Sequence, residues 1–275
     1  MKIKFLGQNC FLFTYNGKNI LSDPFYNFQK EQTGFDISAQ KIDYVLITHA
    51  HGDHIADVKE VLEHHPDCTI IGQPEICGYF NHPNSMDINF GGSAKFDDMK
   101  ISMVPAHHTS SFPDGTYGGQ PCGYIFRFQE KNVYFAGDTG VMADMAYFSQ
   151  LFGEITLSIL PIGGHYTMCA RKAAFAASEL LKCKKVIGCH FDTFPPIKIN
   201  QDSAKQLFAE KNIDFSIPKL EKNLKYNCRK ISKKGIKNGK LPKSHRYNRL
   251  PLLRSHPGGF SGAGCLGLAA AKIQN

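Results

Sequence analysis

Three features are missing from this sequence of 275 residues: tryptophan, a C-x-x-C pair among its nine cysteines, and any run of about 20 apolar residues. Without such a run we expect no membrane span and no membrane partner. The odd number and wide spacing of the cysteines argue against a disulfide framework or a zinc knuckle and favour a reducing cytoplasm. The absence of a G-x-S-x-G motif argues against a serine nucleophile on a strand-to-helix turn.

Acidic residues are missing from the C-terminal end of the chain. Residues 228–275 hold 11 of the 32 Lys and Arg residues and no Asp or Glu, which leaves 21 basic and 24 acidic side chains in residues 1–227. The periodicity of strands and helices also stops there. We therefore predict a folded domain over 1–227 and a basic extension over 228–275 that is disordered or artefactual. Nucleic acid is expected as a partner only through this basic tail, if at all.

Apolar runs typical of strands alternate with amphipathic helical patterns along residues 1–227. Asn16-Gly17 is a strong hairpin signal and predicts that the chain opens with a meander. The order of the later patterns predicts an α+β or α/β fold with sheets inside and helices outside. Strands are expected at 2–7, 10–15, 18–24, 43–48, 69–72, 99–106, 122–129, 132–138, 156–163 and 184–190, and helices at 56–65, 141–151, 170–182 and 202–210.

A dense cluster of metal-binding residue types follows the fourth expected strand. The segment THAHGDH contains His49, His51, Asp53 and His54, which offer nitrogen and oxygen ligands within six residues. Alternation along a strand would place the first two histidines on one side, and Gly52 would permit the sharp turn that brings the other two ligands round. Such ligands suit Zn, Mn or Fe. The alternative is a His-rich polar loop without a metal.

Three further strands end in residues of the same types. His107 and His108 follow one strand, and Asp138 and His190 each end another. Polar residues at strand ends build sites at the edge of a sheet. Each alone could be a capping Asp or a surface His, but together with the THAHGDH cluster they predict one metal centre.

The order of these motifs resembles that of the metallo-β-lactamase superfamily of metal-dependent hydrolases. The pattern H-x-H-x-D-H is followed by a His, by G-D-T and by a late His. HTSS at 108–111, AGDTG at 136–140, PIGGHYTM at 161–168 and HFDTFPP at 190–196 are more narrowly similar to the small single-domain branch related to ascorbate-6-phosphate lactonases. The resemblance covers residues 1–227 and implies a four-layer αββα sandwich with two divalent metal ions at one edge. We expect the metal to be Zn, with Mn or Fe as alternatives.

The resemblance also implies a ligand set. One metal would be held by His49, His51 and His108, the other by Asp53, His54 and His190, and Asp138 would bridge them. The HTSS context favours His108 over its neighbour His107. Two cations about 3.5–4 Å apart lower the pKa of a shared water towards about 7, so that a metal-bound hydroxide attacks the substrate. We thus expect a dinuclear metal-dependent hydrolase acting on a small-molecule ester, lactone or phosphodiester.

Weaker predictions concern residues around the ligands. Asp23, in LSDPF, would accept the outer N–H of a ligand histidine and fix its tautomer, unless it is an ordinary turn residue. His165 and Tyr166 would face the substrate as general acid or oxyanion donor, unless they belong to a structural polar loop. We count His165 as catalytic together with Asp53 and Asp138.

Three residues near the last expected strand are given supporting roles. Alternation along that strand points Cys189 away from the metals, so a buried inert thiol is expected. Asp192 and Thr193 flank His190 and are expected to orient it without touching the metals.

Two rival functions stay open. A metallo-β-lactamase-fold nuclease would use a similar ligand set, but residues 1–227 are net acidic and no large inserted domain fits between Asp138 and His190. A non-catalytic metal- or ligand-binding domain is the second rival, although every ligand type is present. The sequence leaves open the substrate, the native metal and whether the protein is a homo-oligomer.

Overall fold

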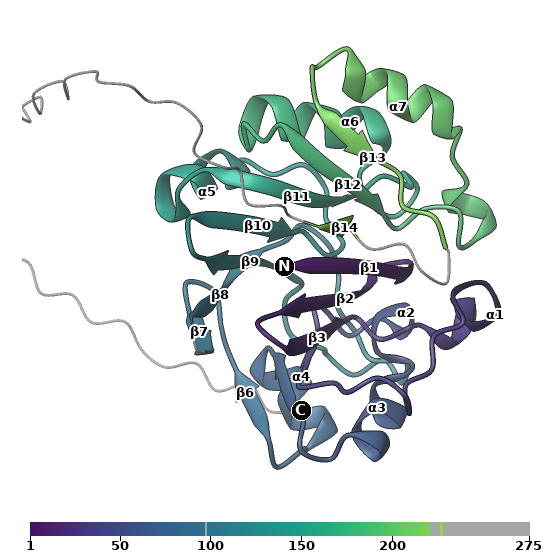
Figure 1. The fold of residues 1–275 in the computed structure, drawn as a ribbon, viewed down its shortest axis with the longest axis vertical. Helices are drawn as coiled ribbons and strands as arrows, with labels where there is room; N and C mark the ends of the chain where they lie inside the picture. Colours follow the sequence, from purple (N-terminus) through teal and green to yellow (C-terminus); the bar gives the residue numbers. More distant parts are fainter. Residues whose placement is uncertain (97, 221–225, 228–275) are drawn as a thin grey trace, which may run out of the picture. The chain divides into compact units, whose positions relative to one another are not determined.

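Two sheets lie at the centre of the structure, a computed structural model that describes residues 1–96, 98–220 and 226–227 (Figure 1). The strands of the first sheet are, in chain order, β1 (Lys2–Gly7), β2 (Cys10–Tyr15), β3 (Lys18–Ser22), β4 (Tyr44–Leu46), β5 (Thr69–Gly72), β6 (Ser85–Asp87) and β14 (Tyr226–Asn227). Those of the second are β7 (Ser93–Phe96), β8 (Met99–Pro105), β9 (Cys122–Phe128), β10 (Lys131–Phe135), β11 (Ile155–Pro161), β12 (Lys185–Cys189) and β13 (Asp214–Ser216).

Both sheets are built in the same way, from an antiparallel meander followed by parallel strands. In the first, β1, β2 and β3 pair antiparallel, and β4, β5 and β6 continue in parallel. In the second, β7 to β10 pair antiparallel, and β11, β12 and β13 continue in parallel. Asn16 and Gly17 have φ angles of 47° and 77°, as the predicted tight hairpin requires. The ends of β1, β3 and β4, and those of β8, β10 and β12, therefore lie at one edge of their sheets.

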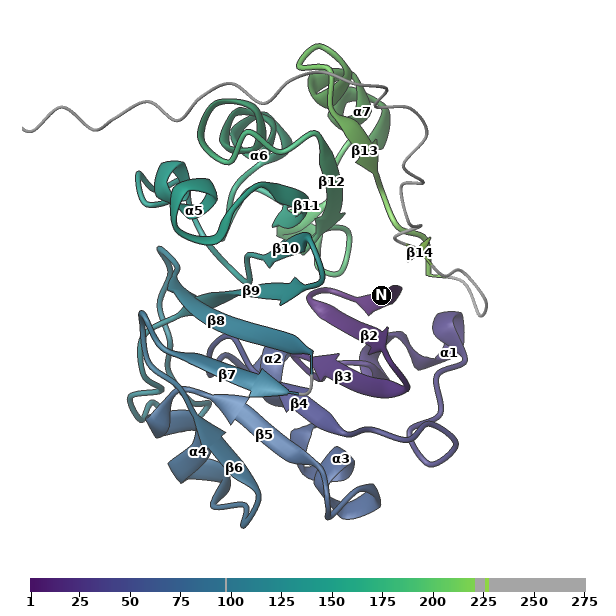
Figure 2. The ribbon, with the colours of Figure 1, turned by 60° about the vertical axis from the view of Figure 1, so that its left-hand side comes forward.

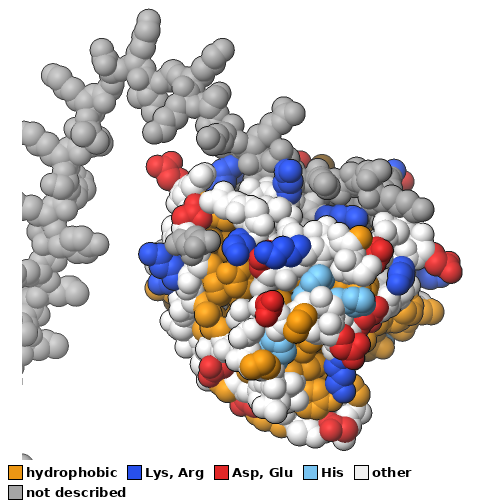
Figure 3. Space-filling view, turned by 60° about the horizontal axis from the view of Figure 1, so that its bottom comes forward, with side chains coloured by type: hydrophobic (Ala, Val, Ile, Leu, Met, Phe, Trp, Pro, Cys, Tyr) orange, Lys and Arg blue, Asp and Glu red, His pale blue; other side chains and the backbone are white. Residues whose placement is uncertain are grey.

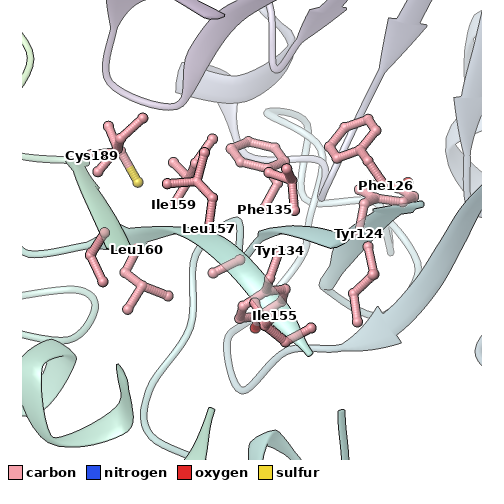
Figure 4. Close-up of a cluster of buried hydrophobic side chains, with 14 of the residues drawn as sticks. Tyr124, Phe126, Tyr134, Phe135, Ile155, Leu157, Ile159, Leu160 and Cys189 are labelled. Carbon is pink, nitrogen blue, oxygen red and sulfur yellow. The ribbon is translucent and has the colours of Figure 1, made fainter. Parts of the chain in front are cut away.

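Side chains of β2 alternate between two hydrophobic cores. The Phe13 ring lies between the sheets, with its centroid 5.0 Å from that of Phe126 and 5.9 Å from that of Phe135. Leu12 points the other way, into the core beneath the outer helices. Figure 4 shows the same alternation in the second sheet, where Phe135 lies on one face and Tyr134 on the other. The period of two in the sequence therefore corresponds to two buried faces.

Helices cover the outer face of each sheet (Figures 1 and 2). The first sheet is covered by α2 (Gly52–Ile55), α3 (Val58–His64) and α4 (Pro74–Phe80), and the second by α5 (Met145–Phe152), α6 (Ala170–Phe175) and α7 (Gln201–Ala209). A short helix α1 (Lys30–Thr33) lies between β3 and β4, and α6 continues as a π-helical turn over Ala176–Leu180. The predicted αββα sandwich is thus confirmed. In the described part of the chain, every helix is too short or too polar to pass through a bilayer.

The expected strands are all present, but several short elements were not expected. They include β6, β7, β13, β14 and α4, the one-turn helices α1 and α2, and 3-10 turns at Asn27–Gln29 and Pro195–Ile197. Strands β6 and β7 are mostly exposed and three or four residues long, so they carry little hydrophobic alternation. The described residues all fall within the first of the two units of the chain, Met1–Arg229. The predicted extension over 228–275 lies outside the described residues and stays a prediction.

Candidate metal centre

Seven candidate ligands lie together at the edge where four strands end. The segment after β4 supplies four of them, and the segments after β8, β10 and β12 supply one each. The potential ligand atoms fall into three groups, and within each group all atoms lie within 4.8 Å of one another. The groups are His49 with His51 and His108, Asp53 with His54 and His190, and His49 with His54 and Asp138. The structure therefore brings together every residue predicted to bind metal.

The Asp138 carboxylate lies at the centre of this cluster. Four imidazole Nε2 atoms surround its Oδ2 atom, at 4.0 Å for His49, 3.6 Å for His54, 3.5 Å for His108 and 2.9 Å for His190. Asp53 Oδ2 is also near, at 3.5 Å from His54 Nε2 and 3.7 Å from His190 Nε2. One carboxylate oxygen thus stands between the two groups of three candidate ligands.

Asp23 and Thr48 turn two of the histidines toward that oxygen. Asp23 Oδ2 lies 2.9 Å from His54 Nδ1 and accepts a hydrogen bond from Thr48 Oγ1 at 2.7 Å. Because that hydroxyl proton is given to Asp23, Thr48 Oγ1 can only accept from His49 Nδ1, 3.0 Å away. Both imidazoles then carry a proton on Nδ1, so that the neutral form of each presents a lone pair on Nε2. The predicted contact between Asp23 and a ligand histidine is present.

Left-handed backbone conformations mark the turns that carry the cluster. Asp23 and His190 have φ angles of 38° and 52°, which residues other than glycine seldom adopt. Gly137, just before Asp138, has a φ of 61°, and a Cβ there would lie 2.9 Å from the Thr48 side chain. Sharp turns directly after strands bring the side chains back over the sheet edge, and strain of this kind gathers at functional sites.

Gly52 does not make the sharp turn that was predicted for it. Its φ lies outside the left-handed range, and a Cβ at this position would meet no atom within 4 Å. Instead it begins the single helical turn α2, with the backbone of His51 extended just before it. Helical rotation, not glycine flexibility, brings Asp53 and His54 round, and that part of the prediction is wrong.

Two buried amides beside the cluster were not predicted. Gln8 Nε2 donates to Asp53 Oδ2 and Asn9 Nδ2 donates to Asp138 Oδ1, each at 2.7 Å. Both side chains are fully buried. In the sequence they only interrupt an apolar run between two strands, and their partners lie 45 and 129 residues away. No short-range signal could have connected them.

The groups of the cluster shift one another's pKa values. Burial opposes ionisation of Asp138, but the imidazoles of His190 and His54 hold the pKa of this carboxyl well below its usual range. Burial disfavours a charged His190, but the Asp138 carboxylate beside it raises its pKa to about 9. Burial and neighbouring imidazoles lower the pKa of His49, His51 and His108. Burial opposes a charged His54, but the surrounding carboxylates raise its pKa well above its usual range. Since imidazoles bind metals in their neutral form, His54 and His190 would each release a proton on metal binding.

The cluster fits divalent cations by its chemistry. His54 Nε2 is buried and has no hydrogen-bond partner among the described residues, although it faces two carboxylates. Imidazole nitrogen and carboxylate oxygen are ligands for Zn, Mn and Fe. A cation would satisfy the free nitrogen and offset the negative charge of Asp53 and Asp138. The structure therefore carries a candidate site for metal ions.

His165 and Tyr166 make no hydrogen bond or ring contact with the seven candidate ligands among the described residues. His165 is exposed and its ring packs on that of Tyr166, with centroids 4.6 Å apart. Their loop is tied to the site by its backbone, because Met168 N donates to Thr139 O at 3.1 Å. His165 is thus near the segment that carries Asp138, but no contact gives it a catalytic role, which stays a prediction.

The prediction for the residues after His190 is wrong. Asp192 binds Ile199 N and Gln201 Nε2, and Thr193 Oγ1 donates to Phe191 O. His190 Nδ1 has no partner among the described residues, so neither side chain orients this imidazole. Cys189 is a fully buried free thiol, as predicted, and burial raises its pKa.

A groove adjoins the cluster at His108. Its volume is about 580 Å³, and its walls are formed largely by Phe90, Pro105, Ala106 and Pro121, with His107 and Gln120 as polar members. On the face seen in Figure 3, histidine side chains reach the surface with hydrophobic side chains beside them. The groove has the size of a small-molecule site.

Comparisons with known proteins agree with this geometry. Residues 18–191 match the family model of the beta-lactamase superfamily domain. A UPF0173 metal-dependent hydrolase of Flavobacterium johnsoniae is 42% identical over 219 residues, which cover 79% of this chain and 96% of the relative. Another, of Thermococcus kodakarensis, is 40% identical over 216 residues, 77% of this chain and 93% of the relative. The solved structure of Igni18, a metallo hydrolase of Ignicoccus hospitalis, matches with a TM-score of 0.73 at 30% identity and covers 83% of this chain and 99% of its own.

Proposed function

The chain belongs to the beta-lactamase superfamily and is a metal-dependent hydrolase. We propose that it uses two divalent metal ions to hydrolyse a small ester, lactone or phosphodiester. One observation carries the proposal: Asp138 Oδ2 lies between two groups of three candidate ligands. One metal would be held by His49, His51 and His108, the other by Asp53, His54 and His190, and both by Asp138.

Metals bound here would supply the positive charge that polarises a scissile group and lowers the pKa of water. The protein's own contribution is to orient its ligands toward the cluster. Asp23 and Thr48 hold the protons of His54 and His49 on Nδ1, away from the cluster. The lowered pKa of Asp138 favours its carboxylate, which would offset the mutual repulsion of two cations. Burial limits competing water around these groups, which strengthens every charge interaction in the site.

The groove beside His108 supports a small-molecule substrate. The mostly apolar walls of the groove would hold an apolar part of the substrate, and the scissile polar group of the substrate would face the cluster. The exposed His165 is a candidate proton donor to the leaving group, on the loop tied to Thr139. Zn, Mn and Fe all suit this donor set. We place the protein in the cytoplasm on the grounds of its cysteine usage.

Hydrolysis assays test the proposal directly. The protein is loaded separately with Zn, Mn or Fe and assayed on aryl esters, lactones and a bis-aryl phosphodiester. We expect metal-dependent turnover of at least one class, and we expect Asp138→Ala to lower it at least 1,000-fold, or about 4 kcal/mol, because it removes the shared ligand. Asp144→Ala, an exposed aspartate six residues on, is the matched control and should keep full activity. Equal activity of the two folded variants would refute the proposed mechanism.

A further inference from the structure

The turn between β1 and β2 touches three of the segments that form the metal centre. Its side chains donate to the cluster carboxylates, Gln8 Nε2 to Asp53 and Asn9 Nδ2 to Asp138, each at 2.7 Å. Its backbone carries two more bonds: Gln8 O accepts from His190 N at 3.0 Å, and Asn9 O accepts from the Ser22 hydroxyl at 2.9 Å. We call Gly7–Asn9 the clasp turn.

The backbone of the clasp turn is held in an unusual shape. Gly7 has a φ of 109° and Gln8 a φ of 51°, and the pairing of β1 with β2 shifts register between Phe5 and Gly7. A Cβ at Gly7 would lie 2.6 Å from the Gln29 side chain, so no other residue fits there without movement. A left-handed glutamine costs conformational energy that a hairpin of ordinary residues would avoid. This shape turns two consecutive side chains into the same buried space.

The contacts of Asn9 leave one oxygen of Asp138 free for the cluster. Asn9 engages Oδ1, whereas the four imidazole Nε2 atoms lie around Oδ2. Gln8, by contrast, binds Asp53 Oδ2, the same oxygen that lies 3.5 Å from His54 Nε2 and 3.7 Å from His190 Nε2, so it holds that oxygen directly beside the two imidazoles. An amide N–H can only donate, so each amide fixes the rotation of a carboxylate without adding charge to the site.

Two amide side chains are energetically unfavourable as simple filling of this buried space. Gln8 Oε1 and Asn9 Oδ1 are buried without a hydrogen-bond partner among the described residues. An unpaired buried acceptor loses its hydrogen bonds to water without replacing them, a cost that an apolar side chain of the same shape would not carry. A role in packing alone therefore does not account for two adjacent buried amides.

We propose that Gln8 and Asn9 are positioning residues that set the two carboxylates for metal binding. Gln8 acts on Asp53 and hence on one metal position, and Asn9 acts on Asp138 and hence on both. The proposal rests on the proposed function, because it assumes two metals at this cluster. Beyond that function, the two amides are expected to differ in their effects on the two metal positions.

The test is a competition titration of Zn and Mn against a chromogenic chelator, on full-length wild type, Gln8→Met and Asn9→Leu. Loss of a group that orients a ligand weakens metal binding about 10–100-fold. We expect Gln8→Met to weaken one equivalent by this factor and to leave the other within about threefold of wild type. We expect Asn9→Leu to weaken both. Asn9→Ala replaces Asn9→Leu if the leucine variant does not fold.

Gln73→Met is the matched control, since Gln73 is a buried glutamine that binds Gln120 N rather than the cluster. It should bind both metals as wild type does. The positioning role is overturned if Gln8→Met and Asn9→Leu fold and bind metal like wild type, or if Gln73→Met weakens metal binding as much as they do. A wild type that binds fewer than two metals would instead refute the dinuclear proposal, so the two failures are distinguishable.

Discussion

At the scale of single residues, Asp23 orients two histidines from behind the metal centre. It is fully buried, accepts from Thr48 N at 2.8 Å and from Thr48 Oγ1 at 2.7 Å, and lies 2.9 Å from His54 Nδ1. Through the Thr48 hydroxyl it also acts on His49. Burial raises the pKa of this carboxyl, and only its contacts with His54 and Thr48 oppose that shift.

Asp23→Asn is expected to weaken metal binding about 10–100-fold while preserving the fold. Asparagine tolerates the left-handed φ of 38° but offers one acceptor oxygen and no charge for the same donors. Chelator competition measures the affinity. Asp36→Asn, at an exposed aspartate, is the control and should have no effect. Identical affinities for the two variants would show that Asp23 has only the role of a turn residue.

His190 makes the metal-free protein sensitive to pH. Its pKa is raised to about 9, because burial is outweighed by the Asp138 carboxylate 2.9 Å from its Nε2. A raised pKa gives stability that is complete below the unfolded value of about 6.5 and is lost as pH rises through about 9. The unfolding free energy of metal-free protein should therefore fall by up to about 3 kcal/mol between pH 6.5 and pH 10.

Denaturant unfolding at several pH values measures this slope. His190→Gln should reduce the slope, because glutamine cannot take up a proton, while His54, whose pKa is also raised by the surrounding carboxylates, keeps part of it. His64→Gln, at an exposed histidine in the last turn of α3, should leave it unchanged. A stability that rises over the same range in wild type would contradict the assignment.

The candidate metal ligands can be predicted from the sequence better than the side chains that orient them. His49, His51 and Asp138 stand directly after apolar strands, so short-range patterns point to them. Asn9 contacts Asp138 across 129 positions, and an asparagine between two strands is equally typical of an ordinary turn. Long-range hydrogen bonds of this kind leave no local periodicity.

At the scale of elements, the loop between β8 and β9 is fixed to the segment after β4. Ser110 Oγ accepts from Ala50 N at 3.1 Å and donates to Gly118 O at 2.9 Å. Gly118 has no room for a Cβ, which would lie 2.3 Å from the Cβ of Ala50. Since Ala50 stands between His49 and His51, the loop supports the backbone of two candidate ligands.

Ser110→Ala is expected to lower the unfolding free energy by about 1–2 kcal/mol, because it leaves the buried Ala50 N–H without its acceptor. It should also speed hydrogen exchange at that amide, which nuclear magnetic resonance measures directly. Ser111→Ala is the neighbouring control, at an exposed side chain. If both variants exchange Ala50 at the same rate, the loop does not support this segment.

Elements with continuous apolar runs can be predicted from the sequence, and short exposed ones cannot. The meander β1 to β3 and strands β8 to β12 carry buried side chains at nearly every position, which apolar runs indicate. Strand β6 has no buried residue, so its place beside β5 follows from the sheet and not from its own sequence. The turn at Gly52 was misread because a single helical turn is too short to show a period of 3.6.

At the scale of the whole molecule, the two sheets are joined by aromatic side chains. The Phe13 ring packs against Phe126 and Phe135 across the interface and is fully buried. The cluster of candidate ligands draws on segments from both sheets, so its geometry depends on this packing.

Phe13→Ala is expected to lower the unfolding free energy by about 3–5 kcal/mol, because it opens a cavity between the sheets. Phe28→Ala should lower it by less than about 1 kcal/mol, since the Phe28 side chain is 53% exposed. Denaturant unfolding of the metal-free proteins measures both. Similar losses in the two variants would mean that the interface between the sheets is not the main core.

Metal content tests the central claim most directly. Elemental mass spectrometry is applied to wild type and to a His51→Ala/Asp138→Ala double variant, both purified without chelator or a histidine tag. We predict close to two equivalents of Zn, Mn or Fe in the wild type and their loss in the folded double variant. A folded wild type that contains no metal and cannot be loaded with any of the three would contradict the account.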